Sequence, residues 1–221
     1  MSEITRLIFV RHGETTWNAE DRMQGQEDSP LSPIGWRQAR LAARKVSQLK
    51  PDLIYTSDLS RARAIAELVA KKLKAPLVVT PELRERNFGE WEGLTNDEVR
   101  QRYPVEAQAH KDDLANFRPP GGESRADVCR RIAAFVDLLL QKHPGKKVLI
   151  STHGGPIKAA VCHALGCEPE AWLRFEISNA SITIIEQREG RLYLTAINEA
   201  CHLEPISKLA KAAEEPEEKL S

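Results

Sequence analysis

Short apolar runs alternate along this chain with segments of helical periodicity, and this alternation limits the fold more than any other feature of the sequence. Runs rich in β-branched and apolar residues at 6–10, 52–56, 76–80 and 147–152 predict buried strands. Residues 181–186 and 192–197 predict two more strands, joined by a turn at Glu189-Gly190. Between the runs, residues 39–49, 62–73 and 128–139 each place their apolar side chains on one helical face.

This order of elements predicts an α/β protein. We expect a three-layer sandwich in which helices cover both faces of a mostly parallel central sheet. Ser57 or Asp58 is expected to cap the second of the three helices, and Ser124 the third.

The length of 221 residues favours one domain, which we place at residues 1–206. The stretch from Thr95 to Ser124 breaks the rhythm because it is polar and rich in proline and ends in Gly121-Gly122. It predicts a short insert over about residues 91–123 that forms a lid over a site. Residues 207–221, rich in Lys, Ala and Glu, predict a frayed or disordered C-terminal tail.

Composition excludes several classes of protein. The 32 basic residues equal the 32 acidic ones, which argues against a nucleic-acid or anionic-membrane binder. The four cysteines form no CxxC pair and predict reduced thiols rather than a disulfide framework or a metal site. The first residues do not read as a signal peptide, and no apolar run is long enough to span a membrane. We therefore expect a cytoplasmic protein. No cluster of residues is spaced like a metal site, and no cofactor is expected.

Charged and histidine side chains follow separate predicted strands. Arg11 and His12 come directly after the first strand, and His153 comes directly after the strand at 147–152. Arg61 lies in the first turn of the helix after the second strand, where the helix dipole disfavours a cation unless an anion binds nearby. Ligands of open α/β sheets bind at the carboxyl ends of the strands. Together these residues predict one pocket for a dianionic phosphate.

Two loops supply further candidates. The loop after His12 carries Asn18, Gln24 and Gly25 and can close over a substrate. The loop at 82–93 holds Glu85 among other carboxylates, together with aromatic residues that indicate packing rather than solvation. Packing is likewise the expected role of the four tryptophans, Trp17, Trp36, Trp91 and Trp172.

Five motifs occur in a specific order: RHGETTWN, SDLSRARAIAE, ELRERNFGEWEGLT, PPGGES and STHGG. From Leu7 to His202 the chain thereby resembles the histidine phosphatase superfamily, also called phosphoglycerate mutase-like. The segment NEACHL at 198–203 is similar to the corresponding end of the alpha-ribazole phosphatase and broad-specificity phosphatase branch. The resemblance implies a metal-independent phosphomonoesterase that works through a phosphohistidine.

The resemblance also implies a role for each matching residue. His12 would be the nucleophile and Glu85 the general acid and then the general base. The phosphate pocket would be lined by Arg11, Arg61 and His153, and the remaining substrate contacts would come from Asn18, Gln24, Gly25 and Gly154. A nucleophilic His12 must be neutral, and we expect a backbone carbonyl near Gly13 to hold its tautomer.

Several alternatives stay open at this point. Cofactor-dependent phosphoglycerate mutase activity is disfavoured by the short lid, which lets water reach a phosphohistidine. A catalytically inactive phosphate-binding module is disfavoured because the five catalytic positions are all filled.

The expected partner is a small phosphomonoester, such as alpha-ribazole 5′-phosphate, phosphoserine, a phosphoglycerate derivative or a sugar phosphate. A homodimer is compatible with the family. The basic lid residues are expected to form a solvated face rather than to bind the substrate: Arg100, Arg102, His110, Lys111 and Arg118.

Overall fold

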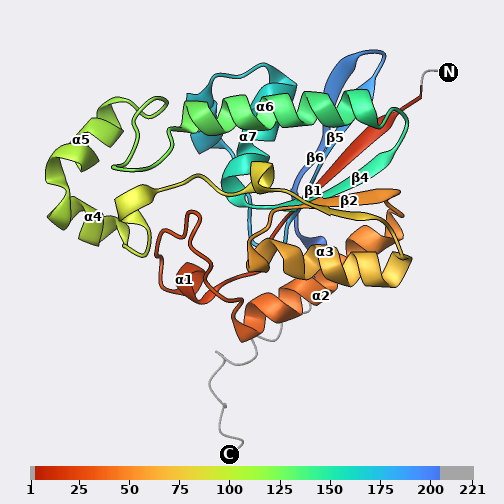
Figure 1. Cartoon of the computed structure of the whole chain (residues 1–221), viewed down its shortest axis with the longest axis horizontal. Coiled ribbons are helices and arrows are strands. Elements are labelled where there is room, and N and C mark those ends of the chain that lie inside the picture. Colours follow the sequence, from red (N-terminus) through yellow and green to blue (C-terminus); the bar gives the residue numbers. More distant parts are fainter. Residues whose placement is uncertain (1–2, 205–221) are drawn as a thin grey trace, which may run out of the picture.

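The computed structural model describes residues 3–204, and a six-stranded sheet runs through its centre (Figure 1). The strand order is β3-β2-β4-β1-β5-β6. Strands β1 to β4 pair in parallel, whereas β5 runs antiparallel to both β1 and β6. The strands span Thr5–Arg11 (β1), Leu53–Thr56 (β2), Leu77–Val79 (β3), Lys147–Thr152 (β4), Ile182–Arg188 (β5) and Arg191–Glu199 (β6).

Helices cover both faces of the sheet, as predicted. Helices α2 (Pro33–Gln48) and α3 (Ser60–Leu73) lie on one face, and α6 (Arg125–Lys142) and α7 (Gly154–Leu165) lie on the other (Figure 1). Side chains of β1 alternate between the two layers: Leu7 and Phe9 pack with α6 and α7, while Ile8 and Val10 pack with α2 and α3. The three-layer α/β sandwich is therefore confirmed.

The start of α3 differs from the prediction. Its N-cap is Leu59, which makes no side-chain cap, so neither Ser57 nor Asp58 holds that position. Asp58 instead forms an ion pair with Arg84, and Asp28 accepts a hydrogen bond from the Ser60 N–H at 2.8 Å. The helix end is thus capped by a carboxylate from a distant loop, which local sequence patterns do not reveal. The predicted cap of α6 by Ser124 is confirmed.

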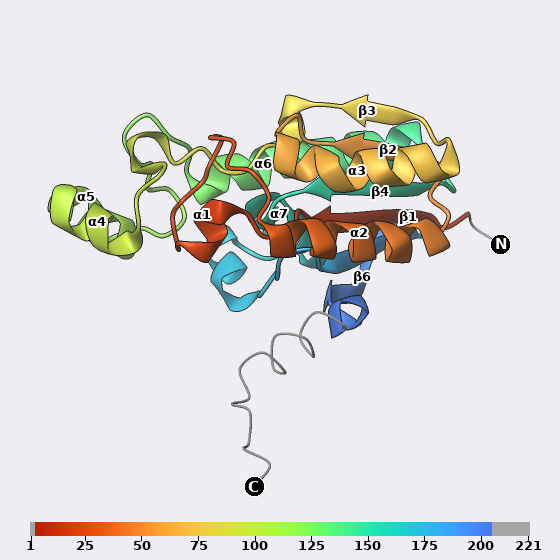
Figure 2. The same ribbon diagram turned by 90° about the horizontal axis from the view of Figure 1, so that it is seen from below.

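The segment after β3 leaves the sandwich and projects beyond the end of the sheet where β1 and β4 terminate (Figure 1 and Figure 2). It contains α4 (Asn96–Arg102) and α5 (Pro104–Asp112), which we call the lid helices. A small cluster of Trp91, Val99 and Ala107 forms their core. The shorter elements are α1 (Thr16–Ala19) and four 3-10 turns, at Pro81–Leu83, Gly89–Trp91, Pro169–Arg174 and Cys201–Leu203.

The predicted tail at 207–221 lies outside the described residues, and the domain boundary at 206 stays a prediction. Across residues 3–204, no helix has both the length and the apolar character that crossing a membrane requires.

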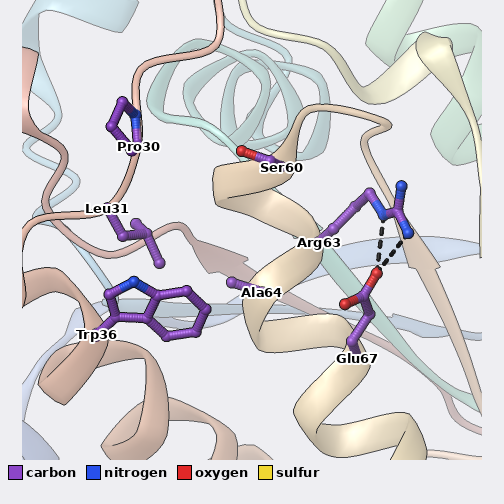
Figure 3. A pocket seen from close by; sticks show the side chains of 7 residues that line it. All are labelled: Pro30, Leu31, Trp36, Ser60, Arg63, Ala64 and Glu67. Atoms are coloured by element: carbon purple, nitrogen blue, oxygen red, sulfur yellow. Dashed lines mark hydrogen bonds and ion pairs between the residues drawn. The ribbon is translucent and has the colours of Figure 1, made fainter.

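Trp36 is one residue whose predicted burial is wrong. Its side chain is 43% exposed, whereas Trp91 and Trp172 are buried. Figure 3 shows Trp36 beside Leu31 in the wall of a surface cavity of about 360 Å³ between α2 and α3. The Arg63–Glu67 ion pair stands on the opposite side of this cavity, which contains none of the predicted site residues.

Candidate active site

His12 stands at the end of β1, the central strand, and is 3% exposed. Its backbone N–H donates to the Thr152 carbonyl at 3.1 Å, which fastens the residue to the end of β4. The imidazole Nδ1 lies 2.7 Å from the Gly13 carbonyl oxygen. Because a carbonyl only accepts hydrogen bonds, Nδ1 must carry the proton and Nε2 keeps its lone pair. The expected carbonyl near Gly13 is therefore present.

His153 directly follows β4 and faces His12. The two rings meet edge to face, with 5.2 Å between their centroids. Burial, and then the positive charges of Arg11 and Arg61, hold the pKa of His12 well below its usual 6.5. Burial and the same two arginines lower the pKa of His153 well below that value too. Both imidazoles are consequently neutral near pH 7.

Arg11 ends β1, whereas Arg61 lies in the first turn of α3, and backbone carbonyls hold both side chains. The Arg11 Nη1 donates to the Ile177 carbonyl at 2.6 Å. The Arg61 guanidinium donates to the carbonyls of Glu27 at 2.5 Å and Gly25 at 2.6 Å. These carbonyls fix the orientation of both guanidinium groups, and Asp28 adds an ion pair with Arg61 at 3.6 Å.

Several buried polar atoms at this place lack a hydrogen-bond partner among the described residues. They are the Nε atoms of Arg11 and Arg61 and both ring nitrogens of His153. A buried unsatisfied donor costs free energy, so four such atoms at one place suit the binding of a polar ligand or water. Next to them begins α7, and an ideal Cβ on Gly154 would lie 3.6 Å from the Arg11 Nε. A helix N-terminus flanked by two arginines favours a tetrahedral oxyanion.

Glu85 lies at the same helix N-terminus. Its Oε2 accepts a hydrogen bond from the Gly155 N–H at 3.1 Å, and its Oε1 accepts one from the Arg86 N–H at 2.8 Å. A Cβ on Gly155 would stand 2.1 Å from Oε1, so only glycine leaves room for the carboxylate. Glu85 also interacts electrostatically with Arg11 and Arg61, which places it at the edge of the cationic pocket.

The loop after His12 brings Asn18 and Gln24 toward the same region. Asn18 Oδ1 accepts from the Thr15 N–H and from the Asn179 amide, each at 3.1 Å. These bonds occupy the amide oxygen, so the NH₂ group of Asn18 is the part available to a ligand. Gln24 is 8% exposed, and its Oε1 has no partner among the described residues.

Glu92 is a positioning residue for which the sequence analysis expected no role. Its carboxylate accepts hydrogen bonds from the backbone N–H groups of Gln26 at 2.9 Å, Glu27 at 3.0 Å and Phe88 at 2.9 Å. It therefore joins the loop that holds Arg61 to the base of the lid. Gly25 has a φ of 54° and no space for a Cβ beside this carboxylate. The only local signal is an acidic residue within the GEWEG motif.

The basic residues of the lid stay outside the pocket. Arg100 pairs with Asp97 and Arg118 with Asp127, and all of Arg100, Arg102, Lys111 and Arg118 are exposed. The expected exposure to solvent is confirmed for these four residues. His110 differs because it packs against Trp91 and Phe117 in the lid core.

Comparison with known proteins places this geometry among phosphatases. Residues 7–200 match the model of the histidine phosphatase superfamily (branch 1). The chain is 32% identical over 213 residues to the metal-independent phosphoserine phosphatase of Arabidopsis thaliana, covering 95% of this chain and 88% of that protein. It is 37% identical over 176 residues to the glucosyl-3-phosphoglycerate phosphatase of Mycolicibacterium vanbaalenii, covering 76% and 78% of the two chains. The solved structure of a mycobacterial glucosyl-3-phosphoglycerate phosphatase with VO3 has a TM-score of 0.80 at 34% identity, and the match covers 88% of this chain and 99% of that one.

Proposed function

Because this chain belongs to the histidine phosphatase superfamily, branch 1, we propose that it hydrolyses small phosphomonoesters through a phosphohistidine on His12, without a metal ion. The chain is an enzyme of the phosphatase class, as its curated relatives are. The reaction path, the roles of individual residues and the substrate are what we propose beyond that class.

In the first step, the Nε2 lone pair of His12 attacks the phosphorus atom and the ester P–O bond breaks. The leaving oxygen takes a proton from the carboxylic acid form of Glu85. Arg11, Arg61 and His153 hold the three peripheral oxygens, whose charge spreads in a loose transition state.

In the second step, water attacks the phosphohistidine. Glu85, now a carboxylate, takes a proton from this water, the P–N bond breaks and inorganic phosphate forms. His12 returns to its neutral form and Glu85 to its acid form, so protons balance over the cycle. Splitting the displacement in two makes each step easier than direct attack by water.

One observation carries this proposal: the contact of 2.7 Å between His12 Nδ1 and the Gly13 carbonyl. It leaves Nε2 unprotonated in a pocket where backbone carbonyls orient both arginines. A histidine kept neutral beside two cations suits a nucleophile toward an anionic ester. Since Arg11 and Arg61 supply the positive charge, this mechanism needs no metal ion.

The test is phosphate release from a panel of esters in the presence of a chelator. The panel contains p-nitrophenyl phosphate, phosphoserine, 3-phosphoglycerate, alpha-ribazole phosphate and a sugar phosphate, and mutase activity is followed in the same samples. Rapid quenching at high pH should trap an acid-labile phosphoryl group on His12. Hydrolysis that needs added metal, or a trapped phosphoryl group on another residue, would overturn the mechanism. Transfer to phosphoglycerate in place of hydrolysis would favour a mutase.

A further inference from the structure

Lys158 lies one turn into α7 and is absent from the mechanism above. Helical side chains lean toward the N-terminus of their helix, so Lys158 extends over the turn formed by Gly154 and Gly155. These two glycines border Arg11 and Glu85, respectively. Lys158 is half-buried, and Arg11 and Glu85 are the charges that affect its ammonium group most. Its side chain therefore reaches the edge of the site beside Glu85.

Arg125 reaches the same region from α6. It is 7% exposed, occupies the first turn of the helix and donates to the Leu114 carbonyl. Its guanidinium lies 5.9 Å from the centroid of the Trp172 ring, and that ring would be 3.0 Å from a Cβ on Gly155. A buried cation at a helix N-terminus opposes the helix dipole, which makes this position costly unless an anion compensates it.

No carboxylate of residues 3–204 forms an ion pair with Lys158 or Arg125. Glu176 and Glu170 act on them only at longer range, and both glutamates are exposed. Burial and the neighbouring arginines lower the pKa of Lys158. Glu85 is the strongest negative charge on Lys158, and it is neutral in the acid form that starts the proposed reaction. In that state the two cations form a positive region with only long-range compensation.

The position of this region decides which part of a substrate it meets. In the proposed reaction, Glu85 protonates the leaving oxygen, so the alcohol part of the ester must lie on the Glu85 side of the phosphate pocket. Lys158 and Arg125 stand on that side. Glu170 and Glu176 reduce the positive charge of this region from a distance. The region therefore suits a singly charged carboxylate better than a second, doubly charged phosphate.

We propose that Lys158 and Arg125 form a subsite for a carboxylate on the alcohol part of the substrate, so that the preferred substrates are phosphate esters of hydroxy acids. This inference rests on the proposed phosphatase function and names the substrate class of the same site.

The test compares two pairs of esters that differ in one carboxylate. 3-Phosphoglycerate is compared with glycerol 3-phosphate, and phosphoserine with phosphoethanolamine. We expect kcat/KM to be about tenfold to 100-fold higher for the acid of each pair, the range for a hydrogen bond between charged groups. Equal rates within a pair would overturn the subsite, and faster hydrolysis of 1,3-propanediol bisphosphate than of 3-phosphoglycerate would overturn its assignment to a carboxylate.

Lys158→Met keeps the length of the side chain and removes its charge. It should lower kcat/KM for 3-phosphoglycerate about tenfold while glycerol 3-phosphate changes less than about twofold. Lys158→Arg should restore part of the preference. The matched control is Lys71→Met, an exposed lysine on α3.

Equal losses on both esters would indicate a structural role for Lys158 and overturn the subsite. Arg125→Lys serves as the second variant because it keeps the charge of a buried side chain. It should retain more of the preference than Arg125→Met, and identical preferences in the two Arg125 variants would remove that residue from the subsite. If the unaltered enzyme does not hydrolyse p-nitrophenyl phosphate, the phosphatase proposal itself is refuted.

Discussion

The phosphate pocket and the lid differ in how they are built. His12 and His153 directly follow the central strands β1 and β4, Arg61 begins helix α3, and all three are at most 3% exposed. The lid helices α4 and α5 share a small apolar core around Trp91 and carry charged side chains exposed to solvent. Residues fixed by the sheet provide the reaction common to a family, whereas residues on a projecting segment are free to vary with the substrate. The predictions below test this division.

His12→Ala should have the largest effect. His12 is the proposed nucleophile, so kcat/KM should fall by at least about 10³-fold for every substrate. Steady-state phosphate release measures this. Retention of more than a few per cent of activity would contradict a nucleophilic role, and a thermal unfolding curve serves as the control for folding.

Glu85→Gln comes next. It keeps the shape of the side chain but removes the acid, so hydrolysis of alkyl phosphates should slow by about 10²-fold or more. p-Nitrophenyl phosphate should lose much less, because its leaving group needs no proton. Equal losses across leaving groups of different basicity would rule out proton donation by Glu85.

The pH dependence of the free energy of unfolding provides a further test of the pocket. Folding lowers the pKa of His12 and His153 below 6.5, so the unfolded chain binds more protons once the pH drops toward and below that value. The free energy of unfolding should therefore fall with decreasing pH by up to about 1.4 kcal/mol per pH unit for each histidine. Urea unfolding from pH 7.5 to 5 measures this slope, and His153→Gln should reduce it. An unchanged slope would mean that His153 is already charged in the native protein.

Trp91→Ala should affect the lid more than the pocket. The ring is 1% exposed and stacks on Phe117 with 5.4 Å between ring centroids, so its loss opens the lid core. We expect KM to rise about tenfold while kcat for p-nitrophenyl phosphate changes little. Limited proteolysis between residues 95 and 118 should become faster. A loss of kcat equal to that of Glu85→Gln would show that lid and pocket are not separable.

Arg102→Gln should have the smallest effect. This arginine is exposed on a lid helix, and surface substitutions of this kind change stability by less than about 0.5 kcal/mol. Activity on 3-phosphoglycerate should stay within about twofold. A larger loss confined to substrates that carry a carboxylate would move the proposed subsite from Lys158 to the lid surface.

The sequence predicted the sheet-borne part of the molecule better than the loops. The strand at 147–152 matches β4 residue for residue because its apolar run is bounded by polar residues on both sides. The position of His12 beside Thr152 followed from the rule that parallel strands share their carboxyl edge. Local periodicity and topology suffice for features of this kind.

Contacts between loops could not be predicted in the same way. The carboxylates of Asp28 and Glu92 bond backbone groups 32 and 66 residues away, and no local pattern encodes those distances. Trp36 lies on an exposed face of α2, where its residue type alone suggested burial. Lys158 was overlooked because a lysine on a helix ordinarily belongs to a solvated face.

The hydrogen bonds of Glu92 make one carboxylate the shared anchor of two neighbouring loops. It accepts from the backbone of Phe88 at the base of the lid and from that of Gln26 and Glu27, and the Glu27 carbonyl is one of the two that orient Arg61. Loss of this carboxylate would leave three backbone N–H groups without their acceptor, so the loop that orients Arg61 would lose its tie to the base of the lid. Replacing Glu92 is therefore expected to disturb the phosphate pocket, whereas opening the lid core at Trp91 is not.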